Sequence, residues 1–264
     1  MLPIAVKYKI SSYGATDIGL VRQNNEDVWA QLPKLKFFIL ADGMGGHQAG
    51  EVAANETVKS LCKIFKKRLS QPDSAEMPLE EMVLLLKKAI MFVNAHVYKM
   101  GRSEPELHGM GTTLCCLLFQ DEHLIYAHVG DSRIYRFRDR RLEQLTKDHS
   151  LISERGEQGQ TIDERMARCS LKNIITKAIG TDSRVDPSVS STPLMMGDLF
   201  LMCSDGLTDV VSGEEIEKVL SEAKDVHAAA EYLIAVANMR GGRDNVTVVL
   251  TRVEGVDEAT YLSR

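Results

Sequence analysis

TTLCCLLFQDEHLIYAHVGDSRIYRFRDRRLEQLT (residues 112–146) decides the fold class of this chain. Its apolar and alternating runs are separated by short polar turns at 120–122 and 138–141, which is the pattern of consecutive strands joined by tight connections. Strand patterns return at LFLMC (199–203) and VTVVLTRV (246–253). The sequence therefore predicts mainly antiparallel sheets.

Helical patterns are inserted between these strands in blocks. Residues 48–70 and 79–100 place apolar residues at intervals of three and four, and shorter helical patterns follow at 213–222 and 226–240. The first stripe consists of Ala54, Val58, Leu61, Phe65 and Leu69. Blocks of strands with inserted helix pairs favour an α+β layered domain over strict strand-helix alternation. Residues 147–180 are polar and charged, which predicts a surface excursion rather than core.

Composition sets the broad class of protein. The chain has 264 residues, 44% hydrophobic and 26% charged, with a formal net charge of −5. These values are typical of a soluble globular domain and offer no electrostatic reason to bind nucleic acid or an anionic membrane. No run is long and apolar enough to span a bilayer, and the first residues lack the pattern of a secretory signal. We expect one domain acting in the cytoplasm.

The cysteines do not indicate catalysis. They are odd in number and form no C-x-x-C pair, which indicates reduced thiols that fill the core. They are Cys62, Cys115, Cys116, Cys169 and Cys203. Cys62 and Arg68 have the spacing of a cysteine-based phosphatase, but the intervening KIFKK has no glycine and lies in a helical pattern, so it predicts no phosphate-binding loop.

Aspartates stand at the ends of apolar runs. Asp42 follows FFIL, Asp205 follows LFLMCS, Asp244 precedes VTVVL, and Asp27 belongs to NNED. Any one of them alone is explained by a turn. Together they form a set of hard oxygen donors without Cys or His, which suits Mg²⁺ or Mn²⁺ rather than Zn²⁺. The set indicates metal-assisted hydrolysis.

Two neighbouring features agree with this chemistry. Gly43, Gly45 and Gly46 let the backbone turn sharply after Asp42 and bring a carbonyl close to an ion. Arg22 is the side-chain type best suited to bind a phosphate dianion through parallel hydrogen bonds. The alternative for Arg22 is a surface salt bridge with Asp17 or Glu26.

Five motifs occur in an order that resembles the metal-dependent protein serine/threonine phosphatases of the phosphatase 2C family, in their compact bacterial form. They are TDIGLVRQNNED (16–27), ADGMGGH (41–47), GTT with VGDSR (111–113 and 129–133), CSDGL (203–207) and GRDNVT (242–247). The resemblance runs from about Ser11 to Arg252. It implies a central antiparallel β-sandwich flanked by helix pairs, in four layers α-β-β-α. It also implies that residues 1–264 form a single catalytic domain with a core of about 11–252 and a flap of about 147–180.

The resemblance also implies roles for individual residues. Asp42 would bridge two metals, the Gly43 carbonyl would bind one of them, and Asp205 and Asp244 would hold the other. Glu26 and Asp27 would form the acidic pair that orders metal-bound water or binds directly. Asp131 would hold a weaker third metal, and Arg22 would bind the phosphate. The cofactors would be Mn²⁺ or Mg²⁺. Two such cations lower the pKa of a bridging water, so that hydroxide attacks phosphorus without a covalent phosphoenzyme.

The chain departs from the family pattern in two places. Many eukaryotic relatives have histidine directly after Asp-Gly as the proposed acid, whereas this chain has Met44 and reaches His47 three residues later. Either His47 or a metal-bound water is then the acid. In the flap, Cys169 and Ser170 stand where bacterial relatives often have His-Pro.

The predicted function is hydrolysis of phosphoserine and phosphothreonine in proteins, with targets of a serine/threonine kinase as partners and a monomeric enzyme. Two alternatives share the fold: a hydrolase of small phosphate esters, and a catalytically silent module that binds phosphoproteins. The silent module requires lost metal ligands, and none is lost in this sequence. Sequence does not separate the small-ester hydrolase from the protein phosphatase, because both use the same chemistry.

Overall fold

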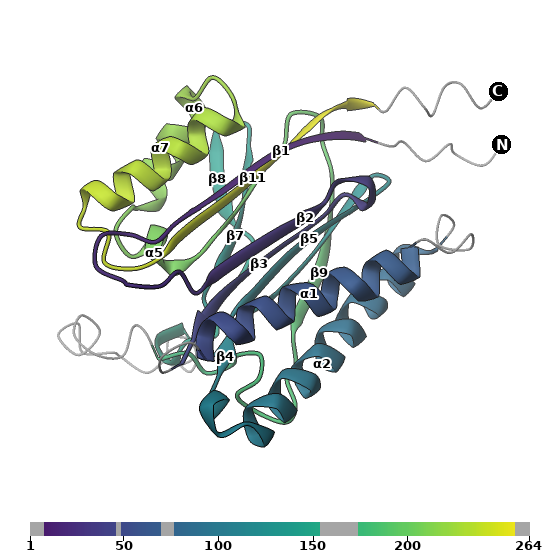
Figure 1. The fold of residues 1–264 in the computed structure, drawn as a ribbon. Coiled ribbons are helices and arrows are strands. Elements are labelled where there is room, and N and C mark those ends of the chain that lie inside the picture. Colours follow the sequence, from purple (N-terminus) through teal and green to yellow (C-terminus); the bar gives the residue numbers. More distant parts are fainter. Residues whose placement is uncertain (1–7, 46–48, 70–76, 154–173, 257–264) are drawn as a thin grey trace.

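Two antiparallel sheets form the centre of the chain, and a pair of helices covers the outer face of each sheet (Figure 1). The structure is a computed structural model that describes residues 8–45, 49–69, 77–153 and 174–256. The sheet pairing and the layers confirm the α+β prediction.

The first sheet joins the two ends of the described chain. Its order is β1 (Tyr8–Asp17), β11 (Val246–Val256), β10 (Leu199–Cys203), β7 (Arg133–Arg138) and β8 (Arg141–Gln144). The second sheet follows the order β2 (Asp27–Leu32), β3 (Phe37–Met44), β5 (Leu114–Gln120), β6 (His123–Val129) and β9 (Ser188–Pro193), and β4 (Gly111–Thr112) pairs with the end of β3.

Each sheet carries its own helices. Helices α1 (Ala49–Leu69) and α2 (Leu79–Ser103) pack on the second sheet, and α6 (Gly213–Glu222) and α7 (Val226–Met239) pack on the first. The short helix α5 (Asp205–Thr208) directly follows β10. Single 3₁₀ turns lie at Pro33–Leu35 and Pro105–Leu107. The helices begin and end within about three residues of the ranges that the sequence predicts, in line with the usual uncertainty of boundaries.

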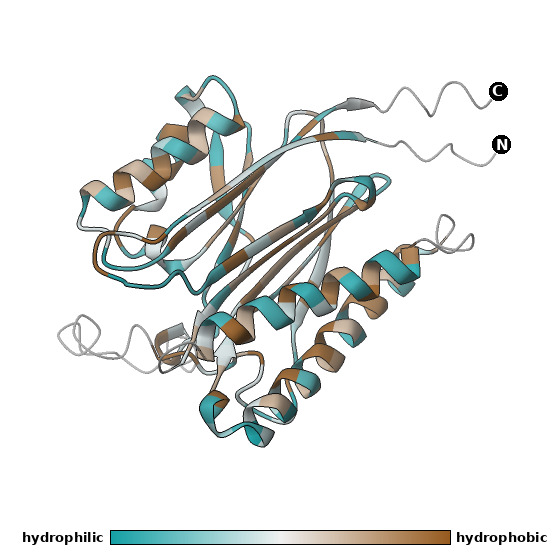
Figure 2. Cartoon of the chain, viewed as in Figure 1, coloured by the Kyte–Doolittle hydropathy of each residue, from teal (hydrophilic) through white to brown (hydrophobic). Residues whose placement is uncertain are grey.

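Strand alternation separates three layers of core. On β3, Phe37 and Ile39 belong to the cluster beneath α1 and α2, whereas Phe38 and Leu40 belong to the cluster between the sheets. Successive side chains of a strand point to opposite faces, so one apolar run supplies both layers. Figure 2 shows the resulting pattern, with hydrophobic strands at the centre and helices that are hydrophobic only in part.

The structure corrects three sequence expectations. Residues 147–180 are not only a surface excursion, because Ile179 is fully buried at one described end and His149 is buried near the other. Strands β1 and β9 were not predicted, since their residues are largely polar or half-buried. Finally, β3 continues through Asp42 to Met44, so Asp42 lies within the strand.

The cysteine interpretation is confirmed for the described residues. Cys115, Cys116 and Cys203 are buried free thiols, and Cys62 is a half-buried thiol within helix α1. Burial raises the pKa of the Cys62 thiol, which disfavours a nucleophilic thiolate. Cys169 lies outside the described residues. Within the described chain, no helix has the length and apolar character needed to cross a membrane.

Candidate metal centre

A cavity of about 270 Å³ gathers most of the predicted site residues. It lies where β2 and β3 of one sheet approach α5 and the start of β11 of the other. Its wall includes Arg22, Glu26, Asp42, Gly43, Asp131, Asp205 and Asp244. Residues from five separate motifs therefore meet around one small volume.

Backbone contacts hold Asp42 and Gly43 in place. The carbonyl oxygen of Asp42 accepts hydrogen bonds from Thr113 N and Thr112 Oγ1, both at 2.8 Å. Gly43 N donates to the carbonyl oxygen of Glu26 at 3.1 Å. A Cβ at Gly43 would lie 2.3 Å from the carbonyl oxygen of Gly50, so glycine is required for the close approach of β3 to α1.

Asp205 is the first residue of α5 and lies at the end of a buried strand. The following residue must be glycine, because a Cβ at Gly206 would lie 2.0 Å from the carbonyl oxygen of Asn245. This contact brings the Asp205 turn against the chain next to Asp244. The two Asp-containing motifs, far apart in sequence, are thus packed backbone to backbone.

Asp27 lies behind the cavity wall rather than in it. It is 5% exposed and stands opposite Asp42 in the pairing of β2 with β3. Its Oδ2 accepts hydrogen bonds from Ser204 Oγ at 2.7 Å and Thr247 Oγ1 at 2.6 Å. Its Oδ1 has no hydrogen-bond partner among the described residues, and burial raises the pKa of Asp27 to about 6.

Asp131 lies between two cavities. Besides the carboxylate-lined cavity, it borders a neighbouring cavity of about 330 Å³ that also touches Asp205 and Asp209. Asp131 is 9% exposed, and its Oδ1 has no partner within the described chain. Burial and then repulsion from Asp148 raise the pKa of Asp131 to about 6.

The electrostatics of the cavity favour cations. Burial and repulsion from Asp131 and Asp244 raise the pKa of Asp205 to about 8, and burial with repulsion from Asp27 raises the pKa of Asp42 well above its ordinary value. Arg22 is the one cationic side chain that lines the described cavity wall. Buried carboxylates with unpartnered oxygens and raised pKa values are the expected property of a site that binds hard divalent ions.

The carboxylates surround the cavity without closing on one point. Among the described residues, no three side chains of His, Cys, Asp or Glu converge tightly enough to enclose an ion. The carboxylates nevertheless share one cavity wall and repel one another, so the charge on each affects the pKa of the others. The donor set therefore fits Mg²⁺ or Mn²⁺ by its chemistry, with modest side-chain movement required to complete coordination.

Arg22 pairs with a residue that the sequence did not indicate. Its Nη2 donates to Asp244 Oδ2 at 2.6 Å, rather than to Asp17 or Glu26. Asp17 instead accepts hydrogen bonds from Gly19 N at 2.8 Å and Asn238 Nδ2 at 3.0 Å. The phosphate-binding candidate is thus held at the cavity by one of the predicted metal ligands.

Three polar residues of the site escaped the sequence analysis. Asn245 accepts from Glu26 N at 2.8 Å and donates to the carbonyl oxygens of Ile18 and Asn24, both at 3.0 Å, so it ties the acidic pair to Asp244. Ser204 and Thr247 hold Asp27. All three lie beside predicted ligands in the motifs CSDGL and GRDNVT, and this proximity was the available signal.

Some expectations lie outside the described residues. They are His47 and the flap residues 154–173. Met44, which stands in place of the family's histidine, lines the cavity wall. The described residues therefore leave the identity of the acid a prediction.

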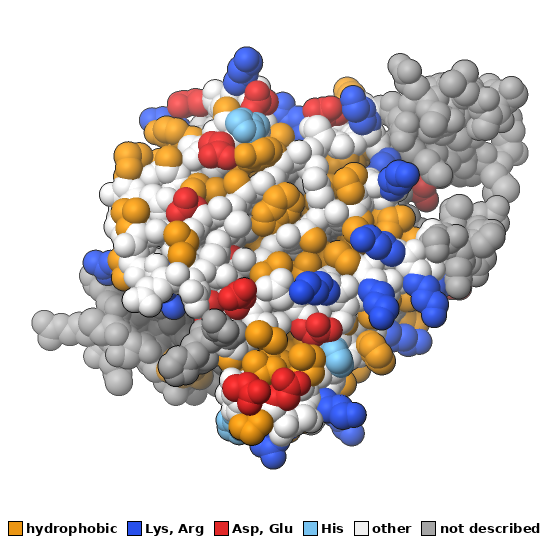
Figure 3. All heavy atoms as spheres, viewed as in Figure 1, with side chains coloured by type: hydrophobic (Ala, Val, Ile, Leu, Met, Phe, Trp, Pro, Cys, Tyr) orange, Lys and Arg blue, Asp and Glu red, His pale blue; other side chains and the backbone are white. Residues whose placement is uncertain are grey.

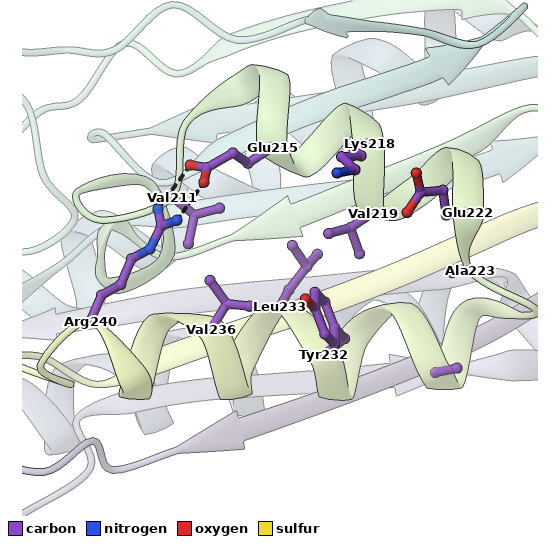
Figure 4. A pocket seen from close by; sticks show the side chains of 11 residues that line it. Val211, Glu215, Lys218, Val219, Glu222, Ala223, Tyr232, Leu233, Val236 and Arg240 are labelled. Carbon is purple, nitrogen blue, oxygen red and sulfur yellow. Dashed lines mark hydrogen bonds and ion pairs between the residues drawn. The ribbon is translucent and has the colours of Figure 1, made fainter.

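A different cavity, of about 540 Å³, lies between α6 and α7 (Figure 4). Val219, Leu233 and Val236 contribute apolar side chains to it, and Glu215 forms an ion pair with Arg240 at one end. Because its two acidic residues do not form a carboxylate cluster, this cavity is not a candidate metal centre.

Comparisons with known proteins agree on one family. The family model described as "Protein phosphatase 2C" matches residues 18–246. The chain is 37% identical over 238 residues to the serine/threonine phosphatase stp of Listeria monocytogenes, covering 89% of this chain and 92% of that one.

Solved structures share the fold. The serine/threonine phosphatase Stp1 from Staphylococcus aureus aligns with a TM-score of 0.86 and 33% identity, covering 95% of this chain and 97% of that chain. The catalytic domain of the serine threonine protein phosphatase PstP, solved in complex with 2 manganese ions, aligns with a TM-score of 0.79 and 35% identity, covering 93% and 99%.

Proposed function

The chain belongs to the protein phosphatase 2C family and is a metal-dependent protein serine/threonine phosphatase, and we propose that the carboxylate-lined cavity is its catalytic centre. The observation that carries this proposal is the meeting of Asp42, Asp205 and Asp244 around one cavity beside Arg22. Its cofactors are Mn²⁺ or Mg²⁺ ions. When bound, two such ions activate the attacking water and neutralise charge on the phosphoryl oxygens.

The residues of the cavity divide into ligands and supports. Asp42, the Gly43 carbonyl, Asp205 and Asp244 bind the core ions, and Glu26 lies beside them. Asp27 supports the site from behind the cavity wall. Hydrogen bonds from Ser204 and Thr247 to its Oδ2 fix the orientation of the carboxylate, and its Oδ1 stays without a partner among the described residues. Oxygen donors held by hydrogen bonds in this way need little reorganisation when a substrate arrives.

Arg22 binds the phosphoryl group of the substrate. Its guanidinium is half-exposed at the cavity and hydrogen-bonded to Asp244, so it lies close to where phosphate oxygens would bind. A planar guanidinium forms two parallel hydrogen bonds with such oxygens and stabilises the charge that builds in the transition state. Asp244 binds either Arg22 or an ion through Oδ2, so ion binding would release Arg22 toward the substrate.

Asp131 binds a weaker third ion. Its unpartnered, buried oxygen and its position between the two cavities support this role. Asp205 could share in holding such an ion, because Asp131 and Asp205 line both cavities. Either His47 or a water would protonate the leaving serine or threonine oxygen.

Phosphorylated proteins are the substrates, and we assign targets of a serine/threonine kinase as the specific class. The enzyme is a monomer and acts as one catalytic domain in the cytoplasm. The free thiols of Cys62, Cys115, Cys116 and Cys203 support a reducing compartment.

The test is phosphate release from matched phosphoserine, phosphothreonine and phosphotyrosine peptides, with Mn²⁺ and with a chelator. We expect hydrolysis of the first two peptides, lost on chelation and restored by added ion. Activity that survives complete chelation would contradict the metal mechanism. Faster hydrolysis of small phosphate esters than of every phosphopeptide would favour the small-ester hydrolase instead.

A further inference from the structure

Three large apolar side chains are exposed on the segments that precede Arg22 and Asp244, two residues of the catalytic cavity wall. Leu20 is 70% exposed, Val21 is 64% exposed and Met239 is 74% exposed. Leu20 and Val21 belong to the turn after β1, and Met239 is the last residue of α7. We call these three side chains the apolar ledge. Single exposed apolar residues are common, but a group of them beside an active site requires an explanation.

The two parts of the apolar ledge are neighbours in space. Leu20 N donates to the carbonyl oxygen of Gly242 at 2.7 Å. A Cβ built on Gly242 would lie 2.9 Å from Leu20 Cγ and 2.8 Å from Asn238 Oδ1, so the Leu20 side chain lies over the segment that follows Met239. Figure 1 shows the dark turn after β1 running alongside the yellow segment between α7 and β11.

The turn that carries the apolar ledge is firmly held. Asp17 Oδ1 accepts hydrogen bonds from Gly19 N and from Asn238 Nδ2. Gly19 has a φ of 79°, and a Cβ there would lie 2.4 Å from the carbonyl oxygen of Asp244. Apolar groups held in place before binding lose little conformational entropy when a partner arrives. The backbone of the turn that carries Leu20 and Val21 is therefore preformed.

The apolar ledge is continuous with the catalytic cavity. Val21 is followed directly by Arg22, and the segment beneath Leu20 leads within two residues from Gly242 to Asp244. A peptide whose phosphorylated residue enters the cavity extends by about 3.3 Å per residue, so side chains within a few residues of it are close enough to reach the apolar ledge. Because the apolar ledge adjoins the cavity, we expect the substrate polypeptide itself to bind it.

Other surfaces are less well placed for this contact. Lys59, Lys63 and Lys66 form a basic surface on the later turns of α1, whereas it is the first turn of that helix that approaches Gly43 and the cavity. Figure 3 shows several blue Lys and Arg side chains gathered over α1, whereas scattered hydrophobic side chains lie on the left of the molecule. The α6–α7 cavity is lined along the length of α7 as far as Arg240, and its wall does not include Leu20, Val21 or Met239.

We propose that Leu20, Val21 and Met239 form a subsite that binds an apolar side chain of the protein substrate, located within about three residues of the phosphoserine or phosphothreonine. The proposal rests on the proposed function, because it requires a phosphopeptide in the cavity. It makes the enzyme selective for sequence context, while the chemistry at phosphorus stays the same. One apolar contact of this kind changes kcat/KM by about tenfold.

The experiment uses phosphothreonine peptides that differ only in having Leu or Gln at each position on either side of the phosphorylated residue. Each kcat/KM is divided by the value for p-nitrophenyl phosphate with the same enzyme, so that damage to the metal centre cancels. We expect Leu at one or two positions to raise the normalised kcat/KM about tenfold. In Leu20→Asn and Met239→Gln, which keep side-chain length, the ratio of the Leu to the Gln value should fall toward one.

Phe92→Gln is the matched control, since Phe92 is 68% exposed on α2, which packs on the other sheet. Its preference for Leu should equal that of the unsubstituted enzyme. An unchanged Leu preference in both ledge variants, or no Leu preference at all, would overturn the proposal. If a ledge variant changes the sedimentation coefficient but not the peptide preference, the apolar ledge is instead a contact surface for a second copy of the chain. Hydrolysis of p-nitrophenyl phosphate without hydrolysis of any phosphopeptide would instead contradict the proposed function.

Discussion

Asp244 shows how a single carboxylate serves two partners. Its Oδ1 accepts a hydrogen bond from Asn245 N at 2.8 Å, and its Oδ2 binds Arg22. The first contact orients the carboxylate, and the second is exchangeable because both side chains are partly exposed. A surface ion pair of this type contributes little to stability, so its exchange for a divalent ion costs little.

Replacing Asp205 or Asp244 with Asn should abolish most of the turnover. Asn keeps the shape but removes the negative charge that holds a hard cation. We expect phosphate release to fall by more than about 10²-fold, with weaker Mn²⁺ binding in calorimetry. Asp186→Asn is the control, because that carboxylate is exposed and paired with Lys87. Near-normal turnover and Mn²⁺ affinity in Asp205→Asn would remove Asp205 from the ligand set.

Replacing Arg22 with Ala should raise KM for phosphopeptides and lower kcat if the contact tightens in the transition state. Mn²⁺ affinity should not fall, because the substitution removes a competitor for Asp244 Oδ2. Arg22→Lys keeps the charge without the planar fork and should recover only part of kcat/KM. Unchanged kinetics in Arg22→Ala would reduce this residue to a structural ion pair.

At the scale of elements, the junction between β3 and α1 shapes the centre. A Cβ at Gly50, in the first turn of α1, would lie 2.8 Å from Met44 N and 2.7 Å from Glu26 Oε2. The backbone of β3 therefore runs directly against the start of the helix. Any side chain at this contact displaces the strand end that carries Asp42 and Gly43.

We expect Gly50→Ala to lower the free energy of unfolding by about 1–3 kcal/mol through overpacking and to weaken Mn²⁺ binding. Gly213→Ala is the matched control, because it is also a first-turn helix glycine but a Cβ there meets nothing within 4 Å. Thermal melts and calorimetry measure both effects. Equal behaviour of the two variants would show that the β3–α1 contact tolerates a side chain.

At the scale of the whole molecule, the centre lies where the two sheets meet. Asp27 and Asp42 come from the second sheet, Asp205 follows β10 of the first sheet, and Asp244 precedes β11 of that sheet. The hydrogen bonds of Asp27 to Ser204 and Thr247 cross between the sheets. The charge on these carboxylates therefore affects how stably the two sheets pack against each other.

The chelated protein should become less stable as pH rises from about 4 to about 8. The folded-state pKa values of Asp205, about 8, and of Asp27 and Asp131, about 6, lie above the ordinary value of 3.8, so the folded state binds more protons than the unfolded state in this interval. The stabilisation that comes from protonating these carboxyl groups is fully present below their ordinary pKa of 3.8. It is lost as pH rises through their folded-state pKa values. We expect a higher melting temperature at pH 6 than at pH 8 in chelator.

Mn²⁺ should remove much of this pH dependence, because the ions replace protons as the neutralising charge. Asp205→Asn should reduce it in chelator, since the substitution removes a carboxyl group whose pKa is raised to about 8. A melting temperature in chelator that rises between pH 6 and pH 8 would show that the carboxylates are not destabilising in the folded state.

The sequence alone determined the layers, the helices and the main candidate ligands. Period-two and helical patterns depend on local geometry, so they were readable at β5, β6, β10, α1 and α7. Asp42, Asp205 and Asp244 were identifiable because each stands beside an apolar strand and a glycine or a family motif. In contrast, β1 and β9 were missed because their stability comes from neighbouring strands rather than from an apolar pattern of their own.

Only the tertiary structure decided how the site is supported. It paired Arg22 with Asp244, placed Asp27 behind the cavity and joined Leu20 to the end of α7. These contacts link residues that lie far apart in the chain, with separations of 222 for Arg22 to Asp244 and 220 for Asp27 to Thr247. No local pattern encodes such partners, because hydrogen bonds and packing between distant segments depend on how the two sheets stack.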